Sequence, residues 1–134
     1  MTTENRFKNF VEDMAKECNS YFATQEWVFG TLTNPFIKFH HQVRRDSKPT
    51  NSIFTMQHFP RMSIVVNIKI EYKALETLQQ LKIPIVAPIS LYANSRGIIF
   101  IPTNGDSTNI VKFILRQLVY ALKFENKTSQ ISKN

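Results

Sequence analysis

The sequence predicts an α/β fold in three layers, in which helices flank a short parallel sheet. Two β-branched apolar runs, at residues 64–68 and 83–89, have the composition of buried strands. Between them, residues 71–81 carry apolar side chains at helical spacing, which makes a βαβ unit with parallel strands and a right-handed crossover. Amphipathic stretches near both ends of the chain supply further helices. The expected architecture is therefore flavodoxin-like or Rossmann-like.

The first predicted element is an amphipathic helix over residues 4–20, and a short extended segment follows at residues 21–23. Residues 26–35 form a compact loop of aromatic, glycine and hydroxyl residues, which ends where Pro35 pushes the preceding residue away from helical angles. Residues 36–43 have the spacing of a short helix. The apolar face of the first helix consists of Phe7, Phe10, Val11, Met14 and Cys18.

The second half continues with the helix at residues 71–81 and the strand at residues 83–89. Pro84 and Pro88 lie near the two ends of that strand, where a proline costs few ladder hydrogen bonds. The apolar face of the helix consists of Ala74, Leu75, Leu78 and Leu81.

A third strand is predicted at residues 98–101, followed by a turn in which Asp106 or Ser107 caps the last helix. That helix is expected over about residues 108–123, and the polar residues 125–134 are expected to be a frayed tail. Residues 1–124 therefore form one expected domain, with a basic loop region at residues 35–58. The residues that the last helix is expected to bury are Ile110, Val111, Ile114, Leu115, Leu118 and Leu122.

Charge favours a polyanionic partner. The 134-residue chain has a formal net charge of +7 and a pI of about 9.7. Nucleic acid is the commonest partner of such a chain, and a merely basic protein is the alternative. Cys18 is the only cysteine, which rules out an intrachain disulfide and fits a reducing compartment. No apolar run is long enough to span a membrane, and the first residues resemble neither a secretory signal nor a mitochondrial presequence.

The motifs of common α/β enzymes are missing from the sequence. The three glycines, Gly30, Gly97 and Gly105, are too far apart for either standard phosphate-binding loop. The first two predicted strands end in Asn67 and Ser90 rather than in the carboxylates that would hold magnesium. We therefore expect neither a catalytic centre nor a bound cofactor.

The histidines and the cysteine do not indicate a metal site. His40 and His41 are adjacent, so their rings diverge on a helix, and His58 stands alone. Cys18 belongs to an apolar stripe, where a packed thiol is expected rather than a nucleophile. We expect no metal.

Cations cluster in and just after the basic loop region, with Phe36, Phe39 and the three histidines interleaved. A flexible cationic loop with planar side chains suits RNA phosphates and exposed bases. The alternative is a solvated loop without RNA contacts. The candidate RNA-binding residues are Lys38, Arg44, Arg45, Lys48 and Arg61.

Several short motifs follow one another along the chain. Residues 27–34 resemble an R-W-x-G-G-T-L-T-N signature, after a helix that ends in a cysteine-containing turn. Residues 81–87 resemble L-G-I-P-V-I-A, and residues 97–107 resemble G-I-D-Y-P-I-P-G-N-D-D-S with one residue deleted. Motifs of this kind occur in this order in the small-subunit ribosomal protein S2 family, which the chain resembles over roughly residues 10–122.

The resemblance implies structural roles within these motifs. Trp27 would anchor its loop in the core, Gly30 would permit a tight turn, and Asn34 would hydrogen-bond that turn. The alternative is a folded loop with no part in RNA binding. The motif residues are Trp27, Gly30, Thr31, Leu32, Thr33, Asn34, Pro84, Pro102, Asn104, Asp106 and Ser107.

The departures from the family pattern are also informative. Glu26 stands where the family has arginine, and Phe29 where it has the first glycine. Residues 89–95 replace the family's V-D-T-N-C-D-P, and the long helical hairpin of bacterial members is expected to be absent or vestigial. The family's N-terminal part has no counterpart in the chain. With these departures, the chain resembles a divergent mitochondrial member of the S2 family that comprises the C-terminal part of the family domain.

The resemblance implies a structural constituent of the mitochondrial small ribosomal subunit, with rRNA and neighbouring ribosomal proteins as partners. Abundant Phe, Ile, Asn, Lys and Tyr indicate an AT-rich genome, so the gene is expected to be organellar. Since a small parallel sheet has an edge that needs covering, a separate polypeptide is expected to supply the missing strands. The alternatives are a small flavodoxin-like enzyme or nucleotide binder, and a free RNA-binding accessory factor.

Overall fold

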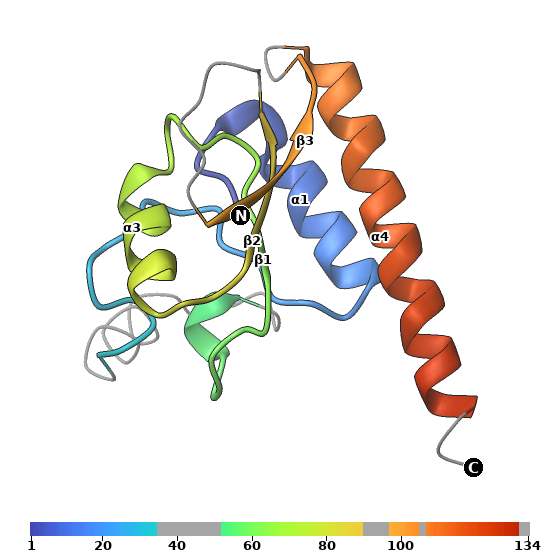
Figure 1. The fold of residues 1–134 in the computed structure, drawn as a ribbon, viewed down its shortest axis with the longest axis horizontal. Coiled ribbons are helices and arrows are strands. Elements are labelled where there is room, and N and C mark those ends of the chain that lie inside the picture. The colour runs from blue at the N-terminus through green and yellow to red at the C-terminus, as the bar shows by residue number, and fades with distance from the viewer. Residues whose placement is uncertain (35–51, 90–96, 105–106, 132–134) are drawn as a thin grey trace.

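The predicted α/β fold is confirmed by a computed structural model, which describes residues 1–34, 52–89, 97–104 and 107–131 (Figure 1). Strands β1, β2 and β3 lie in that order in one sheet, and both neighbouring pairs are parallel. The short helix expected at residues 36–43 lies outside the described residues. The elements are α1 (Asn5–Glu17), a 3-10 helix η1 (Ile53–Thr55), β1 (Ser63–Ile64), α3 (Tyr72–Gln80), β2 (Ile85–Ile89), β3 (Ile98–Pro102) and α4 (Thr108–Ile131).

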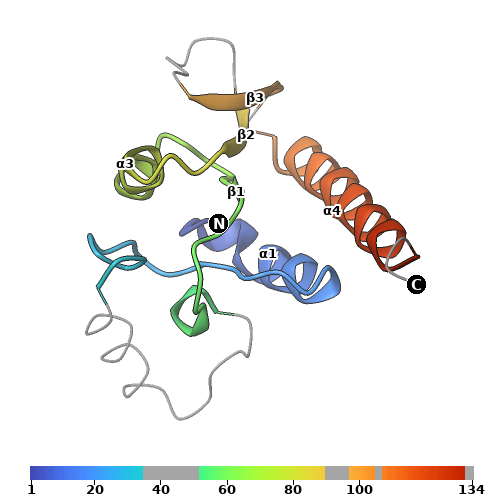
Figure 2. The ribbon, with the colours of Figure 1, turned by 60° about the horizontal axis from the view of Figure 1, so that its bottom comes forward.

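Two hydrophobic clusters on the two faces of the sheet produce the three layers. On one face, Ala74 and Leu78 of α3 pack in a cluster with Ile85 and other residues of β2. On the other face, Phe7 of α1 and Val111 of α4 belong to a second cluster. Figure 2 shows α3 and α4 on opposite sides of the strands. All five residues of β2 are buried, as expected of the central strand of such a sheet.

The strand β1 is shorter than the sequence predicts. Val65 still donates its N–H to the Val86 carbonyl at 2.9 Å, but the chain then turns. Asn67 makes that turn, because its side-chain oxygen accepts the Lys69 N–H at 3.1 Å and its carbonyl accepts the Glu71 N–H at 3.1 Å. A local side-chain bond of this kind competes with the sheet ladder. The strand therefore consists of Ser63 and Ile64, and of the five residues in the predicted run only Ile64 belongs to it.

The helix α4 is longer than predicted, because it continues to Ile131 rather than ending near Lys123. Residues 124–131 contain no glycine or proline that would end it. The expectation that Ile110 is buried is also wrong, since its side chain is 42% exposed. α4 lies beside α1 in the same direction: Arg6 contacts Thr108 near the two N-termini, and Lys123 pairs with Glu17 at 2.7 Å further along.

The helices α1 and α3 end in the same way. After α1, Asn19 has a φ of 51°, and the N–H groups of Asn19 and Ser20 bond back to Lys16 and Ala15. After α3, Lys82 has a φ of 55°, and the N–H groups of Lys82 and Ile83 bond back to Gln79 and Leu78. This is the Schellman arrangement, whose left-handed position usually holds glycine. Both ends therefore carry a residue in a conformation that glycine adopts more easily.

The outer edge of β1 is not bare where the chain starts. The Met1 amino group donates to the Ile64 carbonyl, and the Val66 N–H donates to the Met1 carbonyl at 3.1 Å. This is the bond pattern of neighbouring parallel strands. The Thr2 N–H also donates to the Ala23 carbonyl at 2.9 Å. Met1 therefore covers the part of this edge that lies beside Ile64 and Val66.

Candidate nucleic-acid interface

The loop from Trp27 to Asn34 is attached to the core through its tryptophan. Trp27 is 4% exposed, and its indole N–H donates to the Thr77 hydroxyl of α3 at 3.2 Å. Thr77 in turn donates to the Lys73 carbonyl at 3.0 Å, so both polar groups are satisfied inside the protein. The aromatic ring thus ties the loop to the face of the sheet that α3 covers.

The turn itself depends on Gly30, which has a φ of 88°. The Gly30 carbonyl accepts the N–H groups of Thr33 and Asn34 at 3.1 and 2.8 Å. Thr31 and Leu32 are buried, whereas Thr33 and Asn34 are exposed. A positive φ suits glycine because it has no Cβ to clash. The loop is thus a folded, self-bonded shape rather than a flexible tip.

The exposed outer part of this loop carries little positive charge. Val28 and Phe29 are 44% and 54% exposed, and Glu26 forms an exposed ion pair with Lys73 at 3.4 Å. Glu26 stands where the family that the chain resembles has arginine. The loop therefore offers backbone and apolar groups, and cations that contact phosphates must come from elsewhere in the chain.

The predicted cations are only partly placed by the structure. Lys38, Arg44, Arg45 and Lys48 lie outside the described residues, and so does Asp106 of the motif residues. Arg61 is exposed in the bend just before β1 and lines an open groove of about 490 Å³. That groove is mostly apolar, with residues of α1, α4 and β1 in its walls. It stays a prediction that the five cations bind RNA together.

The remaining motif residues surround β2 and β3. The Pro84 carbonyl accepts the Ser63 N–H at 2.9 Å, which joins the start of β1 to the residue before β2. Pro102 ends β3 opposite Ile89. The Asn104 carbonyl accepts the Ser107 N–H at 3.2 Å, and the Ser107 carbonyl accepts the Val111 N–H at 3.1 Å. Ser107 therefore lies directly before α4, and its carbonyl accepts the first hydrogen bond of the helix.

A second basic group was missed at the sequence level. Lys112 and Arg116 lie on one side of α4, and their charged groups sit 5.6 and 5.5 Å from the centre of the Phe10 ring of α1. Lys123 lies further along the same helix. Their spacing of four and seven residues is the signal that could have found them, because it places all three on one side of a helix.

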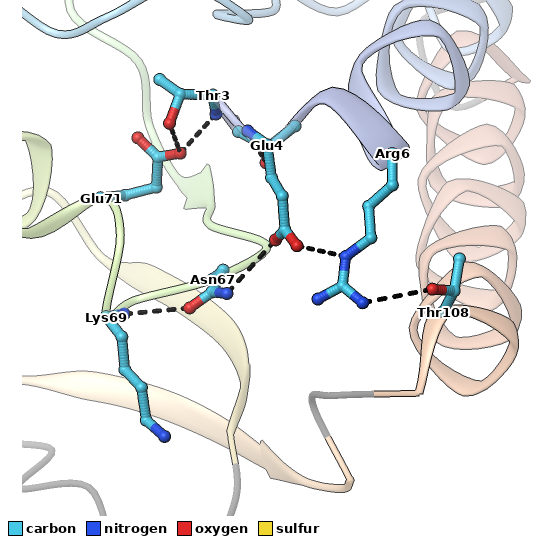
Figure 3. Close-up of polar contacts among 8 residues, drawn as sticks. Thr3, Glu4, Arg6, Asn67, Lys69, Glu71 and Thr108 are labelled. Carbon is cyan, nitrogen blue, oxygen red and sulfur yellow. Dashed lines mark hydrogen bonds and ion pairs between the residues drawn. The ribbon is translucent and has the colours of Figure 1, made fainter.

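The carboxyl end of β1 is where an α/β enzyme would place its polar groups. Here Glu71 accepts the backbone N–H and the hydroxyl of Thr3 (Figure 3). Glu4 accepts from Asn67 at 3.3 Å and from Arg6. Both carboxylates thus hold the N-terminal segment onto the fold. Within the described residues, no three His, Cys, Asp or Glu side chains gather where a metal ion could bind.

The same cluster includes the buried Met1 amino group. Burial lowers the pKa of this group from 8.0 to about 6, and the nearby Glu71 carboxylate opposes part of that shift. Burial disfavours the charged form of an amine because water no longer solvates it. The amine donates to a backbone carbonyl, which needs only an N–H and no charge.

Comparison with known proteins decides the family. The sequence pattern described as Ribosomal protein S2 matches residues 36–124, which is more than half of the chain. The chain belongs to the ribosomal protein S2 family. The family consists of structural proteins rather than enzymes, which confirms the expectation of a non-catalytic chain. The Trp27 loop lies before the matched residues, so its assignment depends on the longer alignments to individual relatives.

Relatives in the family come from bacteria and from an alga. The chain is 27% identical to small ribosomal subunit protein uS2 of Thermosynechococcus vestitus, over 98% of the chain and 61% of that relative. It is 25% identical to uS2c of Cyanophora paradoxa, over 90% of the chain and 64% of the relative. It is 26% identical to uS2 of Flavobacterium johnsoniae, over 91% of the chain and 60% of the relative. The chain thus spans about three fifths of their length.

Among the helices of the described residues, none is both long and apolar enough to cross a membrane.

The family pattern covers β1, α3, β2, β3 and most of α4, which together form the βαβ unit and its continuation. The S2 assignment therefore rests on the part of the chain that builds the sheet.

Proposed function

We propose that this chain is a structural constituent of the small ribosomal subunit that binds rRNA and neighbouring ribosomal proteins. The observation that carries the proposal is the S2 family match over residues 36–124, together with relatives named as small-subunit proteins. The net charge of +7 supports an rRNA partner. The internal use of Glu4 and Glu71 argues against the rival enzyme, because neither carboxylate is left for chemistry.

In this role the α/β core acts as a rigid scaffold for cations. Lys38, Arg44, Arg45, Lys48 and Arg61 are the proposed phosphate contacts. Phosphate contacts position a protein on RNA without reading its sequence. The Trp27 loop would present its backbone at a fixed place, because the tryptophan is buried and the Gly30 turn is closed by two hydrogen bonds.

We further propose that the subunit is mitochondrial and that the gene is organellar. Support comes from the abundance of amino acids that have AT-rich codons and from the shortened stretch at residues 35–58, where bacterial members insert a long hairpin. The proposal is tested by mass spectrometry of purified mitochondrial small subunits. Peptides of this chain at one copy per subunit are expected, and their presence only in plastid or bacterial subunits would reject it.

We also propose that a separate polypeptide lies on the outer edge of β1, beside the exposed Arg61 and Met62. Met1 bonds to Ile64 and Val66 as a neighbouring parallel strand would, so backbone groups on this edge can pair with a further segment. A photo-cross-linker at position 62 in assembled subunits should therefore capture one polypeptide, and a cross-linker at exposed Lys69 should not. Capture of rRNA alone at position 62 argues against the idea.

Sedimentation tests the ribosomal role. The chain should migrate with small subunits at one copy each in moderate salt, whereas an enzyme should remain at the top of the gradient. A free accessory factor should bind at well below one copy. The Arg44→Gln, Arg45→Gln variant should dissociate at lower salt, with the slope of log affinity against log salt falling by about 1–2. Lys69→Gln is the matched control, and equal behaviour of the two variants would count against the basic loop.

A further inference from the structure

The helix α4 is apolar on two opposite sides. One side packs Val111, Leu115 and Val119 toward the core, where all three are buried. The other side exposes large apolar side chains to solvent. These outward residues, which we name the outer stripe, are Ile110, Phe113, Tyr120 and Phe124, which are 42%, 62%, 70% and 67% exposed.

The spacing of the outer stripe is regular. With Gln117 between Phe113 and Tyr120, the positions advance by three, four, three and four residues. This is the spacing at which one helix meets another in a coiled-coil seam. The stripe extends over roughly 21 Å of helix axis, at about 1.5 Å per residue. Contiguous apolar surface on a folded protein commonly marks an interaction site.

The charges beside the stripe restrict what covers it. Between Ser107 and Phe124 every charged residue is a cation, namely Lys112, Arg116 and Lys123. Lys123 already pairs with Glu17 at 2.7 Å. Within the described part of the chain, Lys112 and Arg116 contact the Phe10 ring and form no ion pair. A partner with acidic flanks would pair with both.

We propose that the outer stripe of α4 is a docking surface for an amphipathic helix with acidic flanks, supplied by another protein. A second copy of this chain fits poorly, because it would set the same cations against each other. An RNA helix offers no apolar face for Ile110 and Phe113. A lipid surface would leave the amide of Gln117 without partners in the middle of the stripe, whereas a helix can hydrogen-bond it.

A peptide-binding experiment with the full chain tests this surface. The probe is a labelled three-heptad peptide, about 21 residues long, with leucine at a and d and glutamate at e and g. Its two controls carry lysine instead of glutamate, or the same residues in an order that breaks the heptad. Fluorescence anisotropy should show the acidic amphipathic peptide binding at least about tenfold more tightly than either control.

Matched variants assign the binding to α4. Phe113→Ser, Tyr120→Ser, Phe124→Ser together should remove binding while leaving the net charge and the thermal midpoint unchanged. Phe59→Ser, Tyr72→Ser is the control, since these side chains are 57% and 61% exposed but lie outside α4. Lys112→Glu, Arg116→Glu should reverse the preference toward the lysine peptide.

The contrary outcomes are equally definite. Equal binding of the acidic peptide and its broken-heptad control would mean simple charge attraction and would overturn the proposal. So would a triple serine variant that binds like the unchanged chain. Binding is also measured with two other probes, namely vesicles of phosphatidylcholine with phosphatidylglycerol, and a single-stranded RNA. If either binds through the stripe and the peptide does not, the helix proposal is wrong. None of these measurements requires the ribosomal role to be correct.

Discussion

The two faces of the sheet use their helices differently. On the α3 side, Ala74, Thr77 and Leu78 are buried, and the Trp27 loop closes over the same cluster. On the α1 and α4 side, the second cluster buries only one side of α4, through Val111 and Leu115, and leaves the outer stripe exposed. A helix with a single apolar face can bury all of that face against one neighbouring layer. A helix with two such faces is left with surface that the fold alone does not cover.

The largest difference between the faces should appear when Trp27 is removed. Trp27→Ala deletes a buried ring and leaves the Thr77 hydroxyl without its donor, so unfolding should become easier by about 3–5 kcal/mol. Tyr120→Ala, on the exposed side of α4, should change stability by less than about 0.5 kcal/mol. Urea denaturation of both variants measures this. Similar losses would mean that the two faces are equally closed.

An intermediate effect is expected from pH, acting through the segment that leads into α1. The folded chain lowers the pKa of the Met1 amine from 8.0 to about 6. The unfolded chain therefore binds more protons between these values, so stability rises with pH across this window. Full stability is present above pH 8, and about 2–3 kcal/mol should be lost as pH falls to 6.

N-terminal acetylation is the control for this pH effect. The acetylated amide keeps an N–H for the Ile64 carbonyl but carries no titrating charge. Its stability should change less between pH 6 and 8 than that of the 134-residue chain with a free amine. Equal pH slopes would show that the Met1 amine is not the titrating group.

The smallest expected effect compares the ends of α1 and α3. Lys82→Gly should stabilise the chain by about 1 kcal/mol, because the left-handed backbone is costly for a side chain with a Cβ. Asn19→Gly should gain only a few tenths of a kcal/mol, since asparagine tolerates this region. Thermal midpoints of the two variants measure the difference. A loss of stability in Lys82→Gly would mean that the lysine side chain makes a compensating contact.

Much of the fold could be predicted because the relevant signals are local. The apolar periods predicted α1, α3, β2 and β3, since each period depends only on neighbouring residues. The end of β1 could not be predicted in the same way, because Asn67 reads as an ordinary strand terminus until its bonds to Lys69 and Glu71 are seen. Of the candidate RNA contacts, Arg61 is exposed and the other four lie outside the described residues, so all five stay predictions.

The sequence by itself determined the class of fold, the basic charge and the ordered motifs of the S2 family, because these depend on composition and short-range spacing. Only the tertiary structure decided that Ile110 lies on the outer side of α4 rather than in the core, since its helical position next to the buried face leaves both possible. It also placed Met1 against β1 and Trp27 against Thr77, which is 50 residues away. Such contacts depend on where distant segments meet, and no local pattern specifies that.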